Sequence, residues 1–375
     1  MKKVLVLGCG LVGAVIARRF TETDGIQTTV ADFNEKNLKK LPDGCSTIVA
    51  DLSNPEKITG LAEDFDLVLG ALPGNMGMAS IEAVIKAGKP CVDISFLPEN
   101  PSRLNDAAKS QGIPVVYDFG VAPGMSHLLS AYGAGKLDKA ESLKIYVGGL
   151  PTARKLPYEY AAVFSPIDVI EEYTRPARIV ENGQTTIKPA LSGLELIDFP
   201  GIGTLEAFYT DGLRSLAENL GIPDMVEKTM RYPGHAERMK MLRETGFFSY
   251  DPININGAKI RPIDLTSRLL FPMWKLEEKE REFTVMRVEV GGQKDGGAQK
   301  YVYDLVDYTD EKRGETSMAR TTGLPAYTMA KIILEGVFDR PGVHPPEKIG
   351  ADGSLAKRIL AELRDYEVTI RETSA

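Results

Sequence analysis

Short apolar runs alternate with amphipathic segments through the first third of the chain. The first run, residues 2–7, leads into a glycine-rich turn, and Val12, Ile16 and Phe20 then follow at helical spacing. Further apolar runs of strand length are separated by helical segments and lie at residues 27–31, 47–50, 67–70, 91–94 and 114–117. Strands that alternate with helices predict an α/β domain with a doubly wound parallel sheet and helices on both faces.

The pattern changes in the middle of the chain. Residues 125–136 are predicted to form a helix and residues 142–148 a strand, whereas the prolines and aromatic residues of 150–184 predict a loop-rich stretch. Residues 223–227 are interpreted as a short helical piece, and residues 229–235 as a compact polar insertion before another helix. The regular alternation of the first domain is therefore expected to end near residue 123.

Two stretches with period-two alternation, residues 283–290 and 301–308, are joined by a glycine-rich link. They predict an antiparallel hairpin with one solvent-facing side. Two helices are expected after this hairpin, at residues 325–336 and 355–366. The chain is accordingly divided into a Rossmann-type dinucleotide-binding domain, an α+β domain with an antiparallel or mixed sheet for substrate binding and dimerisation, and C-terminal helices that pack back on the first domain. The three segments are residues 1–123, 124–322 and 323–375.

The composition is that of an ordinary globular protein, with 43% hydrophobic and 26% charged residues among 375. The net charge of −7 argues against nucleic acid or an anionic membrane as the main partner. No apolar run approaches the length of a transmembrane helix and no signal peptide is recognised, so a cytoplasmic location is expected. The cysteines match no metal-ligand spacing and the histidines lie far apart, so no metal site is expected.

The turn after the first apolar run carries glycines with separate roles. Gly8 permits a tight turn, Gly10 lets a pyrophosphate approach the backbone, and Gly13 lets the following helix pack closely on the strand. The N-terminus of that helix offers free N–H groups and a positive dipole end to the phosphates. Asp32 ends the second predicted strand, where its carboxylate can accept both ribose hydroxyls of NAD and repels the 2′-phosphate of NADP. The sequence therefore predicts NAD as the cofactor.

The other strand ends are expected to line the same crevice, because ligands bind at the carboxyl ends of parallel strands. The further residues expected to contact the cofactor lie in the first helical turn or directly after the predicted strands: Leu11, Val12, Asp51, Leu52, Ala71, Leu72, Pro73, Ser95 and Gly120. The alternative interpretation is a glycine turn that joins strand to helix in another kind of doubly wound protein. The placement of the strand, the helix and the acidic residue favours the dinucleotide site.

Several sequence blocks across the chain resemble one known enzyme family. They are Val-Asp-Ile-Ser-Phe at residues 92–96, Gly-Val-Ala-Pro-Gly at 120–124, Arg-Tyr-Pro-Gly-His at 231–235 and Gly-Val-His-Pro-Pro-Glu at 342–347. Together with the glycine turn, they are similar to the saccharopine dehydrogenase family, and most closely to its lysine 6-dehydrogenases. The resemblance implies oxidation of a carbon–nitrogen bond, in which L-lysine, NAD and water give allysine, NADH and ammonia, and the aldehyde then cyclises with the α-amine.

This chemistry requires the substrate ammonium to lose a proton before hydride leaves, and it requires water to attack the resulting imine. Asp93 and Asp118 end predicted strands where the nicotinamide should lie, so either can bind the ammonium or act as the base, with burial raising its pKa. Helix capping or loop hydrogen bonding is the alternative for these aspartates. His127 follows the Pro-Gly turn and can transfer protons near neutral pH, or can hydrogen-bond to the backbone in a structural role.

Arg231 is predicted to bind the α-carboxylate of the substrate, because a guanidinium fork suits a planar carboxylate. A salt bridge between domains or subunits is the alternative role for this arginine. In the family that the chain resembles, substrate contacts gather in the loop-rich insertion. The resemblance therefore implies Glu159, Tyr160 and Ser165 as further substrate contacts.

Two other functions stay open from the sequence. A saccharopine-type dehydrogenase, or a relative that joins an aldehyde to a polyamine, needs a second basic cluster for a second carboxylate, and Arg154, Lys155 and Arg175 could form one. A non-catalytic NAD-binding protein is the alternative from a different class. Because a bare edge strand invites pairing, the hairpin of the second domain also predicts a homodimer through that domain.

Overall fold

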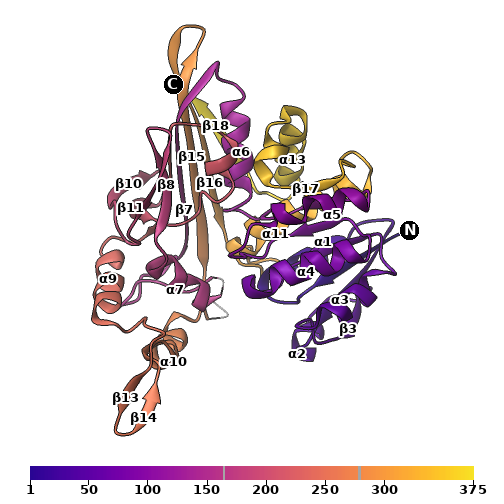
Figure 1. Ribbon diagram of the computed structural model, residues 1–375, viewed down its shortest axis with the longest axis horizontal. Coiled ribbons are helices and arrows are strands. Elements are labelled where there is room, and N and C mark those ends of the chain that lie inside the picture. Colours follow the sequence, from indigo (N-terminus) through magenta and orange to yellow (C-terminus); the bar gives the residue numbers. More distant parts are fainter. Residues whose placement is uncertain (164, 278–279) are drawn as a thin grey trace. The chain divides into compact units, whose positions relative to one another are not determined.

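The computed structural model describes residues 1–163, 165–277 and 280–375, which form two compact units (Figure 1). The first unit consists of Met1–Gly135 and Ala319–Thr369, and the second consists of Lys136–Met318 and Ile370–Ala375. Among the described residues, no helix combines the length and the hydropathy needed to cross a lipid bilayer.

The first unit contains a seven-stranded parallel sheet, which confirms the α/β prediction. The strands are β1 (Lys2–Leu7), β2 (Ile26–Asp32), β3 (Ser46–Val49), β4 (Leu67–Gly70), β5 (Cys91–Asp93), β6 (Pro114–Val116) and β17 (Gly342–His344). Their order is β17-β6-β5-β4-β1-β2-β3, so the direction of strand addition reverses between β1 and β4. In open α/β sheets this switch point is where ligands bind.

Helices cover this sheet because its strands are apolar on both faces and must be buried on both. Val4 to Leu7 of β1, for example, are completely buried. The helices of the first unit are α1 (Leu11–Thr21), α2 (Glu35–Leu38), α3 (Pro55–Ala62), α4 (Gly74–Lys86), η1 (Pro101–Leu104), α5 (Asn105–Ser110), α6 (Met125–Ala134), α12 (Pro346–Gly350), α13 (Gly353–Asp365) and nearly all of α11 (Ser317–Leu334).

The helix α6 belongs to the first unit, so the domain boundary drawn after residue 123 is too early. The reason is the close packing of α6 on α12. A Cβ atom on Gly350 of α12 would lie 2.1 Å from the carbonyl oxygen of Leu128 in α6, so only glycine permits this approach. The two helices therefore pack backbone to backbone.

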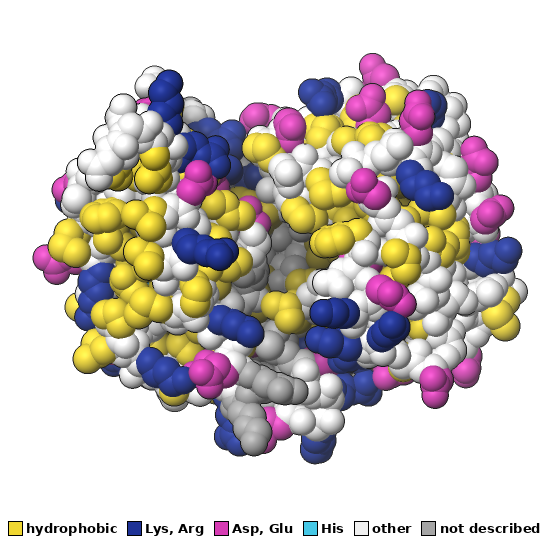
Figure 2. Space-filling model, turned by 90° about the horizontal axis from the view of Figure 1, so that it is seen from below, with side chains coloured by type: hydrophobic (Ala, Val, Ile, Leu, Met, Phe, Trp, Pro, Cys, Tyr) yellow, Lys and Arg dark blue, Asp and Glu magenta, His cyan; other side chains and the backbone are white. Residues whose placement is uncertain are grey.

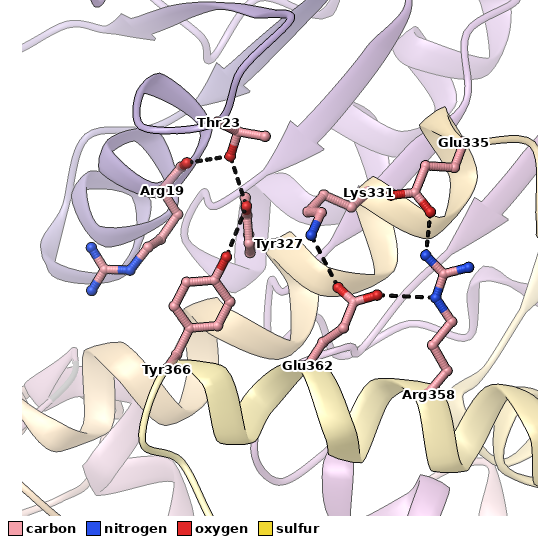
Figure 3. Close-up of polar contacts among 8 residues, drawn as sticks. All are labelled: Arg19, Thr23, Tyr327, Lys331, Glu335, Arg358, Glu362 and Tyr366. Atoms are coloured by element: carbon pink, nitrogen blue, oxygen red, sulfur yellow. Dashed lines mark hydrogen bonds and ion pairs between the residues drawn. The ribbon is translucent and has the colours of Figure 1, made fainter.

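The C-terminal helices α11 and α13 pack on the helix that follows the glycine turn (Figure 3). Thr23, just after α1, shares a hydrogen bond of 2.7 Å with the hydroxyl of Tyr327 in α11. The hydroxyl of Tyr366, at the end of α13, donates to the hydroxyl of Tyr327 over 3.1 Å. Lys331 and Glu362 add an ion pair of 3.2 Å between α11 and α13. Residues Ala319–Thr369 thus complete the first unit, whereas the last residues, Ile370–Ala375, belong to the second unit.

The second unit contains a nine-stranded mixed sheet, as the α+β prediction requires. Its main order is β10-β11-β12-β7-β15-β16-β18, and β8 and β9 are attached beside β12. The strands are β7 (Lys139–Pro151), β8 (Ala177–Glu181), β9 (Gln184–Lys188), β10 (Glu195–Phe199), β11 (Gly203–Tyr209), β12 (Asp224–Arg231), β15 (Glu282–Lys294), β16 (Gly297–Tyr308) and β18 (Ile370–Ser374). The other elements of this unit are α7 (Pro166–Thr174), α8 (Leu216–Asn219), α9 (His235–Thr245), α10 (Pro262–Trp274) and a separate hairpin of β13 (Ile253–Ile255) and β14 (Ala258–Ile260).

Two local predictions for the second unit are wrong. Residues 223–227 are not helical, and the strand β12 begins at Asp224; the polar side chains of Glu227, Lys228 and Thr229 are buried in it, whereas Asp224 is exposed. The stretch 150–184 was expected to be loop-rich, yet it contains α7 and β8. In β12 polar side chains are buried, so the alternation of apolar and polar positions that marks a half-buried strand is missing. The helix α7 does bury Val169, Ile170 and Tyr173 at helical spacing, but it is only nine residues long.

The argument for a dimer through the bare edge of the hairpin is also wrong. The hairpin is present as β15 and β16, but β18 pairs with the outer edge of β16 over Tyr301–Leu305. The strand β18 itself carries the exposed charged residues Arg371 and Glu372, which are typical of a protected edge. The homodimer through the second unit stays a prediction, but a bare edge of this hairpin does not support it.

Candidate active site

The glycine turn brings β1, α1 and the end of β4 into backbone contact. The N–H of Gly8 donates to the carbonyl of Ala31 in β2 over 2.8 Å. A Cβ atom on Gly8 would lie 2.5 Å from the carbonyl oxygen of Ala71, and one on Gly13 would lie 2.1 Å from the carbonyl oxygen of Gly8. These glycines therefore permit the close approach that the dinucleotide fingerprint requires.

Gly10 differs from its two neighbours in the motif. Apart from Gly10 itself and its two chain neighbours, no atom of the described chain lies within 4 Å of the position that its Cβ would take. Gly10 precedes the first turn of α1, where Leu11 is exposed and Val12 is partly buried. The backbone N–H groups of this turn carry the positive end of the helix dipole, so the open space beside Gly10 fits a pyrophosphate.

Asp32 is held rigidly at the carboxyl end of β2. One carboxylate oxygen accepts a hydrogen bond from the N–H of Cys9 over 2.6 Å, and the other accepts from the N–H of Asn34 over 2.7 Å. The side chain is buried, and it lies beside the glycine turn because Cys9 is part of that turn. Each oxygen retains a second lone pair, so the carboxylate can still accept the hydroxyl groups of a ribose.

The remaining residues expected at the cofactor lie at the ends of their strands. Ala71, Leu72 and Pro73 connect β4 to α4, with Leu72 in the core and Pro73 exposed. Asp51 and Leu52 follow β3, at the edge of the sheet next to β2. Leu52 is buried, whereas Asp51 is exposed. Hydrogen bonds from the hydroxyl and N–H of Ser53 lower the pKa of Asp51.

Asp93 is the last residue of β5 and is completely buried. Its carboxylate accepts hydrogen bonds from the N–H of Ser95 over 2.8 Å and from the Ser95 hydroxyl over 3.3 Å. The pKa of Asp93 is raised to about 7, mainly by burial and to a smaller extent by the charge of nearby Asp118, although the hydrogen bonds from Ser95 lower it. A Cβ on Gly70 would lie 1.9 Å from a carboxylate oxygen of Asp93, so this side chain rests on the backbone of β4.

Asp118 follows β6, directly beside the end of β5. The N–H of Phe119 donates to the carbonyl of Asp93 over 3.2 Å, which joins the two strand ends. Asp118 is buried and has a φ of 54°, in the left-handed region that residues other than glycine rarely adopt. Such conformations cluster at functional sites. Gly120 lies in the next turn, where the N–H of Met125 donates to its carbonyl.

His127 lies in α6 and is completely buried. Its Nδ1 atom is 3.1 Å from the hydroxyl oxygen of Ser126. The structure thus brings Gly8, Asp32, Asp93 and the residues after them to one edge of the parallel sheet, as predicted. His127 does not lie at a strand end but in α6, the helix that follows β6.

Arg231 is the last residue of β12 and lies buried in a network of the second unit. Its Nη2 atom donates to Glu172 over 2.5 Å, its Nη1 atom to the carbonyl of Met230 over 2.9 Å, and its Nε atom to the hydroxyl of Tyr173 over 3.4 Å. The guanidinium also lies 4.6 Å from the ring centroid of Tyr160. Arg231 therefore forms a buried ion pair with Glu172. A substrate carboxylate could bind to the guanidinium only by displacing the carboxylate of Glu172.

Two polar groups beside this network make no hydrogen bond within the described residues: the hydroxyl of Tyr160 and the indole N–H of Trp274. Their rings lie 5.5 Å apart, edge to face. His235, which begins α9, bonds to the hydroxyl of Tyr173 over 2.9 Å, and burial lowers its pKa to about 3, so the imidazole is neutral. Buried polar groups without partners mark places where water or a ligand can bind.

The other predicted substrate contacts are less suited to a free ligand. Glu159 pairs with Arg154 over 2.8 Å and with Arg238 over 3.2 Å, and these pairs lower its pKa. Ser165 directly precedes α7 and is partly buried.

The basic cluster considered for a second substrate carboxylate is paired in the same way. Each of its members has a carboxylate partner: Arg154 with Glu159, Lys155 with Glu280, and Arg175 with Glu171.

Two family models match the chain almost from end to end. The saccharopine dehydrogenase NADP binding domain matches residues 4–116, and the saccharopine dehydrogenase C-terminal domain matches residues 120–368. The chain belongs to the saccharopine dehydrogenase family. The resemblance inferred from the sequence blocks is therefore confirmed at the level of the family, and the first unit contains the family's pyridine-nucleotide-binding domain.

Relatives in this family differ in the reaction for which they are named. The chain is 24% identical to alpha-aminoadipic semialdehyde synthase of Bos taurus, covering 96% of this chain but only 47% of the relative, so it spans about half the length of that protein. It is 24% identical to carboxyaminopropylagmatine dehydrogenase of Synechocystis sp., with 95% of both chains covered. The solved saccharopine dehydrogenase (L-Glu forming) of Saccharomyces cerevisiae superposes over the full length of both chains, with a TM-score of 0.84 at 22% identity.

Several residues of this family member were not foreseen from the sequence. Glu172 and Tyr173 lie in the stretch expected to be loop-rich, and their role depends on contact with Arg231, almost sixty positions away. Gly70 has a clearer signal, because a glycine at the end of an otherwise apolar strand suggests close backbone approach. Among the described residues, no group of His, Cys, Asp and Glu side chains is arranged to hold a metal ion.

Proposed function

We propose that this chain is an NAD-dependent dehydrogenase that oxidatively deaminates the ε-amine of L-lysine. The product is allysine, which cyclises to piperideine-6-carboxylate. The observation that carries this proposal is the pair of buried aspartates, Asp93 and Asp118, at adjacent strand ends of the dinucleotide-binding sheet. Two carboxyl groups sheltered from water favour a cationic amine, and one with a pKa of about 7 can accept its proton near neutral pH.

In this proposal the chain's own groups perform the proton chemistry. The ε-ammonium binds between the two aspartates, and Asp93 takes one of its protons so that the neutral amine can release hydride. NAD, when bound, accepts that hydride from the ε-carbon. An aspartate then accepts a proton from the water that attacks the imine, and ammonium leaves. One lysine, one NAD and one water thus give one allysine, one NADH, one ammonium and one proton.

The fit of NAD to the first unit is supported by the open space beside Gly10 and by the fixed carboxylate of Asp32. The matched domain is named for NADP, and so is the saccharopine dehydrogenase of Saccharomyces cerevisiae. We nevertheless propose NAD for this chain, because an acidic side chain at this position, in place of a basic one, repels the 2′-phosphate of NADP. Asp32 is the residue on which this choice depends.

Asp32→Asn is expected to reduce the preference for NAD over NADP at least tenfold. The asparagine oxygen can still accept the N–H of Cys9 in the glycine turn, whereas its NH2 group cannot accept the N–H of Asn34, and the negative charge is removed. A charge-assisted hydrogen bond contributes about 1.5–3 kcal/mol, which corresponds to roughly 10- to 100-fold in binding. The measurement is kcat/KM with each cofactor, with the exposed Asp24→Asn as the matched control. An unchanged preference in Asp32→Asn would mean that Asp32 does not face the ribose.

The test of the reaction itself is NADH formation by the purified protein with NAD and L-lysine. Ornithine, saccharopine and polyamines are assayed in parallel, and ammonia is measured with NADH. We expect turnover on lysine with one ammonia per NADH. Turnover on saccharopine alone, without ammonia, contradicts the lysine proposal.

A second candidate is a dehydrogenase of secondary amines such as saccharopine or a carboxyaminopropyl polyamine. It is favoured by the relatives that align over their whole length, including the carboxyaminopropylagmatine dehydrogenase. The ion pairs of Arg154, Lys155 and Arg175 weigh against it, because a second substrate carboxylate would have to displace acidic side chains. The same assay separates the two candidates.

A further inference from the structure

Most of the exposed large apolar side chains of the first unit lie at one end of its parallel sheet. Among the described residues of this unit, the large apolar side chains that are exposed are Met1, Leu11, Phe33, Val49 and Val337. Leu11 begins α1, Phe33 follows β2, and Val49 ends β3. Single apolar side chains among charged ones are normal on a protein surface, as the hydrophobic side chains on the right of Figure 2 illustrate. Three of them at the carboxyl ends of neighbouring strands need a different explanation.

Phe33 lies on a turn that is fixed on both sides. It is 77% exposed, more than any other aromatic side chain in the described part of the chain. The N–H of Asn34 donates to the carboxylate of Asp32 over 2.7 Å, and the N–H of Ala50 donates to the carbonyl of Asp32 over 3.0 Å. Asn34 in turn caps α2 by accepting a hydrogen bond from the N–H of Lys36 over 3.1 Å. Because burial of a phenylalanine side chain stabilises by about 1.5–3 kcal/mol, a ring kept in water on a fixed turn suits a ligand that covers it.

Val49 lies beside Asp32 on the neighbouring strand. The two residues are register partners in the parallel pairing of β2 and β3, so their side chains lie on the same face of the sheet. On that face the carboxylate of Asp32 accepts the N–H of Cys9, in the glycine turn, over 2.6 Å. Val49 is 61% exposed on β3, the edge strand. Apolar side chains thus adjoin the carboxylate in two directions, along the chain at Phe33 and across the sheet at Val49.

The chemistry of the ligand follows from the position of Asp32. The first unit contains the family's pyridine-nucleotide-binding domain, in which an acidic residue at this place accepts the ribose hydroxyls of the adenosine half. The adenine base is attached directly to that ribose, so it must lie close to the carboxylate. Its flat faces stack on aromatic side chains, and removing such a side chain costs about 1–3 kcal/mol of binding per base. The pyrophosphate needs N–H groups or cations instead, which the side chains of Phe33 and Val49 do not offer.

We propose that Phe33 and Val49 form the binding site for the adenine base of the cofactor, with the phenyl ring stacked on one face of the base. The isopropyl group of Val49 then packs against the adenosine from the neighbouring strand. The inference requires only that a pyridine nucleotide binds to the first unit. It does not depend on lysine as the substrate or on the choice between NAD and NADP, because both cofactors carry the same base.

The first test is calorimetric titration of the full chain with ADP-ribose, which carries the adenine, the riboses and the pyrophosphate but no nicotinamide. Phe33→Ala is expected to weaken binding of ADP-ribose about 10- to 100-fold, the effect of removing one stacked aromatic ring. Phe33→Tyr keeps a ring that can stack and is expected to bind with nearly the wild-type affinity. Without ligand, the stability of Phe33→Ala is expected to stay within about 0.5 kcal/mol of the wild type, because the side chain is largely exposed.

A spectroscopic test reports the contact directly. The chain contains one tryptophan, Trp274, which is buried in the second unit. Phe33→Trp adds an indole ring at the proposed site, and its fluorescence is expected to be quenched when ADP-ribose stacks on it. Val337→Trp adds an indole ring at an exposed position of the same unit, after α11, and its fluorescence is expected to stay unchanged.

The matched control for affinity is Val337→Ala, which shortens an exposed apolar side chain of the same unit and is expected to bind ADP-ribose as the wild type does. The inference is overturned if Phe33→Ala binds ADP-ribose as tightly as the wild type, or if ADP-ribose leaves the fluorescence of Phe33→Trp unchanged. A wild-type protein that does not bind ADP-ribose overturns it as well. If the wild type binds ADP-ribose through Phe33 but does not oxidise lysine, the adenine site stands and the proposed reaction fails.

Discussion

Asp93→Asn is expected to lower kcat by about 10²- to 10⁴-fold, the range that general base catalysis contributes. The carboxylate of Asp93 is buried at the carboxyl end of β5 and has a pKa of about 7. Asparagine keeps nearly the same shape and can still accept the N–H of Ser95, but it cannot take a proton. Binding of NAD, which the glycine turn determines, is expected to change little. The measurement is kcat with lysine, together with the dissociation constant for NAD.

The pH dependence makes this prediction specific. Asp93 must be ionised to accept a proton, so kcat of the wild-type enzyme is expected to fall as the pH drops below about 7. Asp93→Asn should lack this limb, because the residue that titrates is gone. The exposed Asp64→Asn should retain the wild-type profile. A variant with wild-type kcat, or with the same limb near pH 7, would assign the base to another residue.

The same substitution is expected to stabilise the fold at high pH. The pKa of Asp93 is raised from 3.8 to about 7 on folding, so its burial costs nothing below pH 3.8 and stability is lost as the pH rises through 7. Above pH 7 the loss amounts to about 4 kcal/mol, from 1.36 kcal/mol for each pKa unit. Asp93→Asn should therefore unfold at a higher urea concentration than the wild type at pH 8 and at nearly the same one at pH 4. If Asp93→Asn has lower activity but higher stability than the wild type, the carboxylate of Asp93 serves the reaction and not the stability of the fold.

The first unit could be predicted from the sequence because its signals are local. The glycine turn, Asp32 and the strand ends each depend on a few neighbouring residues, and the right-handed connections of a parallel sheet then bring them together. The strand β17 escaped prediction because only three residues, Gly342–His344, form it. Its place beside β6 comes from a contact more than two hundred positions distant in sequence.

The second unit could not be predicted to the same extent because its polar residues are buried in pairs. In β12, Glu227 accepts a hydrogen bond from Thr210 over 2.5 Å, and Lys228 pairs with Glu195 over 2.5 Å. Burial raises the pKa of Glu227 to about 8. A strand with such residues inside shows no alternation of apolar and polar positions. Arg231 at its end stays a predicted substrate contact, and its partner Glu172 lies in a stretch that the sequence analysis interpreted as loop-rich.

Gly13→Ala and Gly10→Ala are expected to fail in different ways, although both change the glycine turn by one methyl group. A Cβ on Gly13 would lie 2.1 Å from the carbonyl oxygen and 3.0 Å from the carbonyl carbon of Gly8. These are backbone atoms, and Gly8 is itself fixed by its hydrogen bond to Ala31 and by close contact with Ala71. Because nothing there can move aside cheaply, Gly13→Ala should destabilise the protein by about 3 kcal/mol or more and weaken NAD binding at least 100-fold.

Gly10→Ala meets no such obstacle inside the protein. Its φ of −76° suits any residue, and no described atom beyond its own chain neighbours lies within 4 Å of the added methyl group. Thermal stability should therefore stay within about 0.5 kcal/mol of the wild type. The methyl group instead occupies the space through which the pyrophosphate approaches the backbone, so NAD binding should weaken about tenfold or more. Calorimetric titration with NAD and thermal unfolding measure the two effects separately.

The comparison of the two variants locates the cofactor without requiring turnover. If Gly10→Ala binds NAD as the wild type does, the pyrophosphate does not lie over the N-terminus of α1, and the fingerprint has been misassigned. If Gly13→Ala is as stable as the wild type, α1 can shift away from β1, and the close packing of helix on strand is not needed here. The expected pattern, in which Gly10→Ala loses affinity alone and Gly13→Ala loses both affinity and stability, follows only if the ligand fills the space beside Gly10 and the protein fills the space beside Gly13.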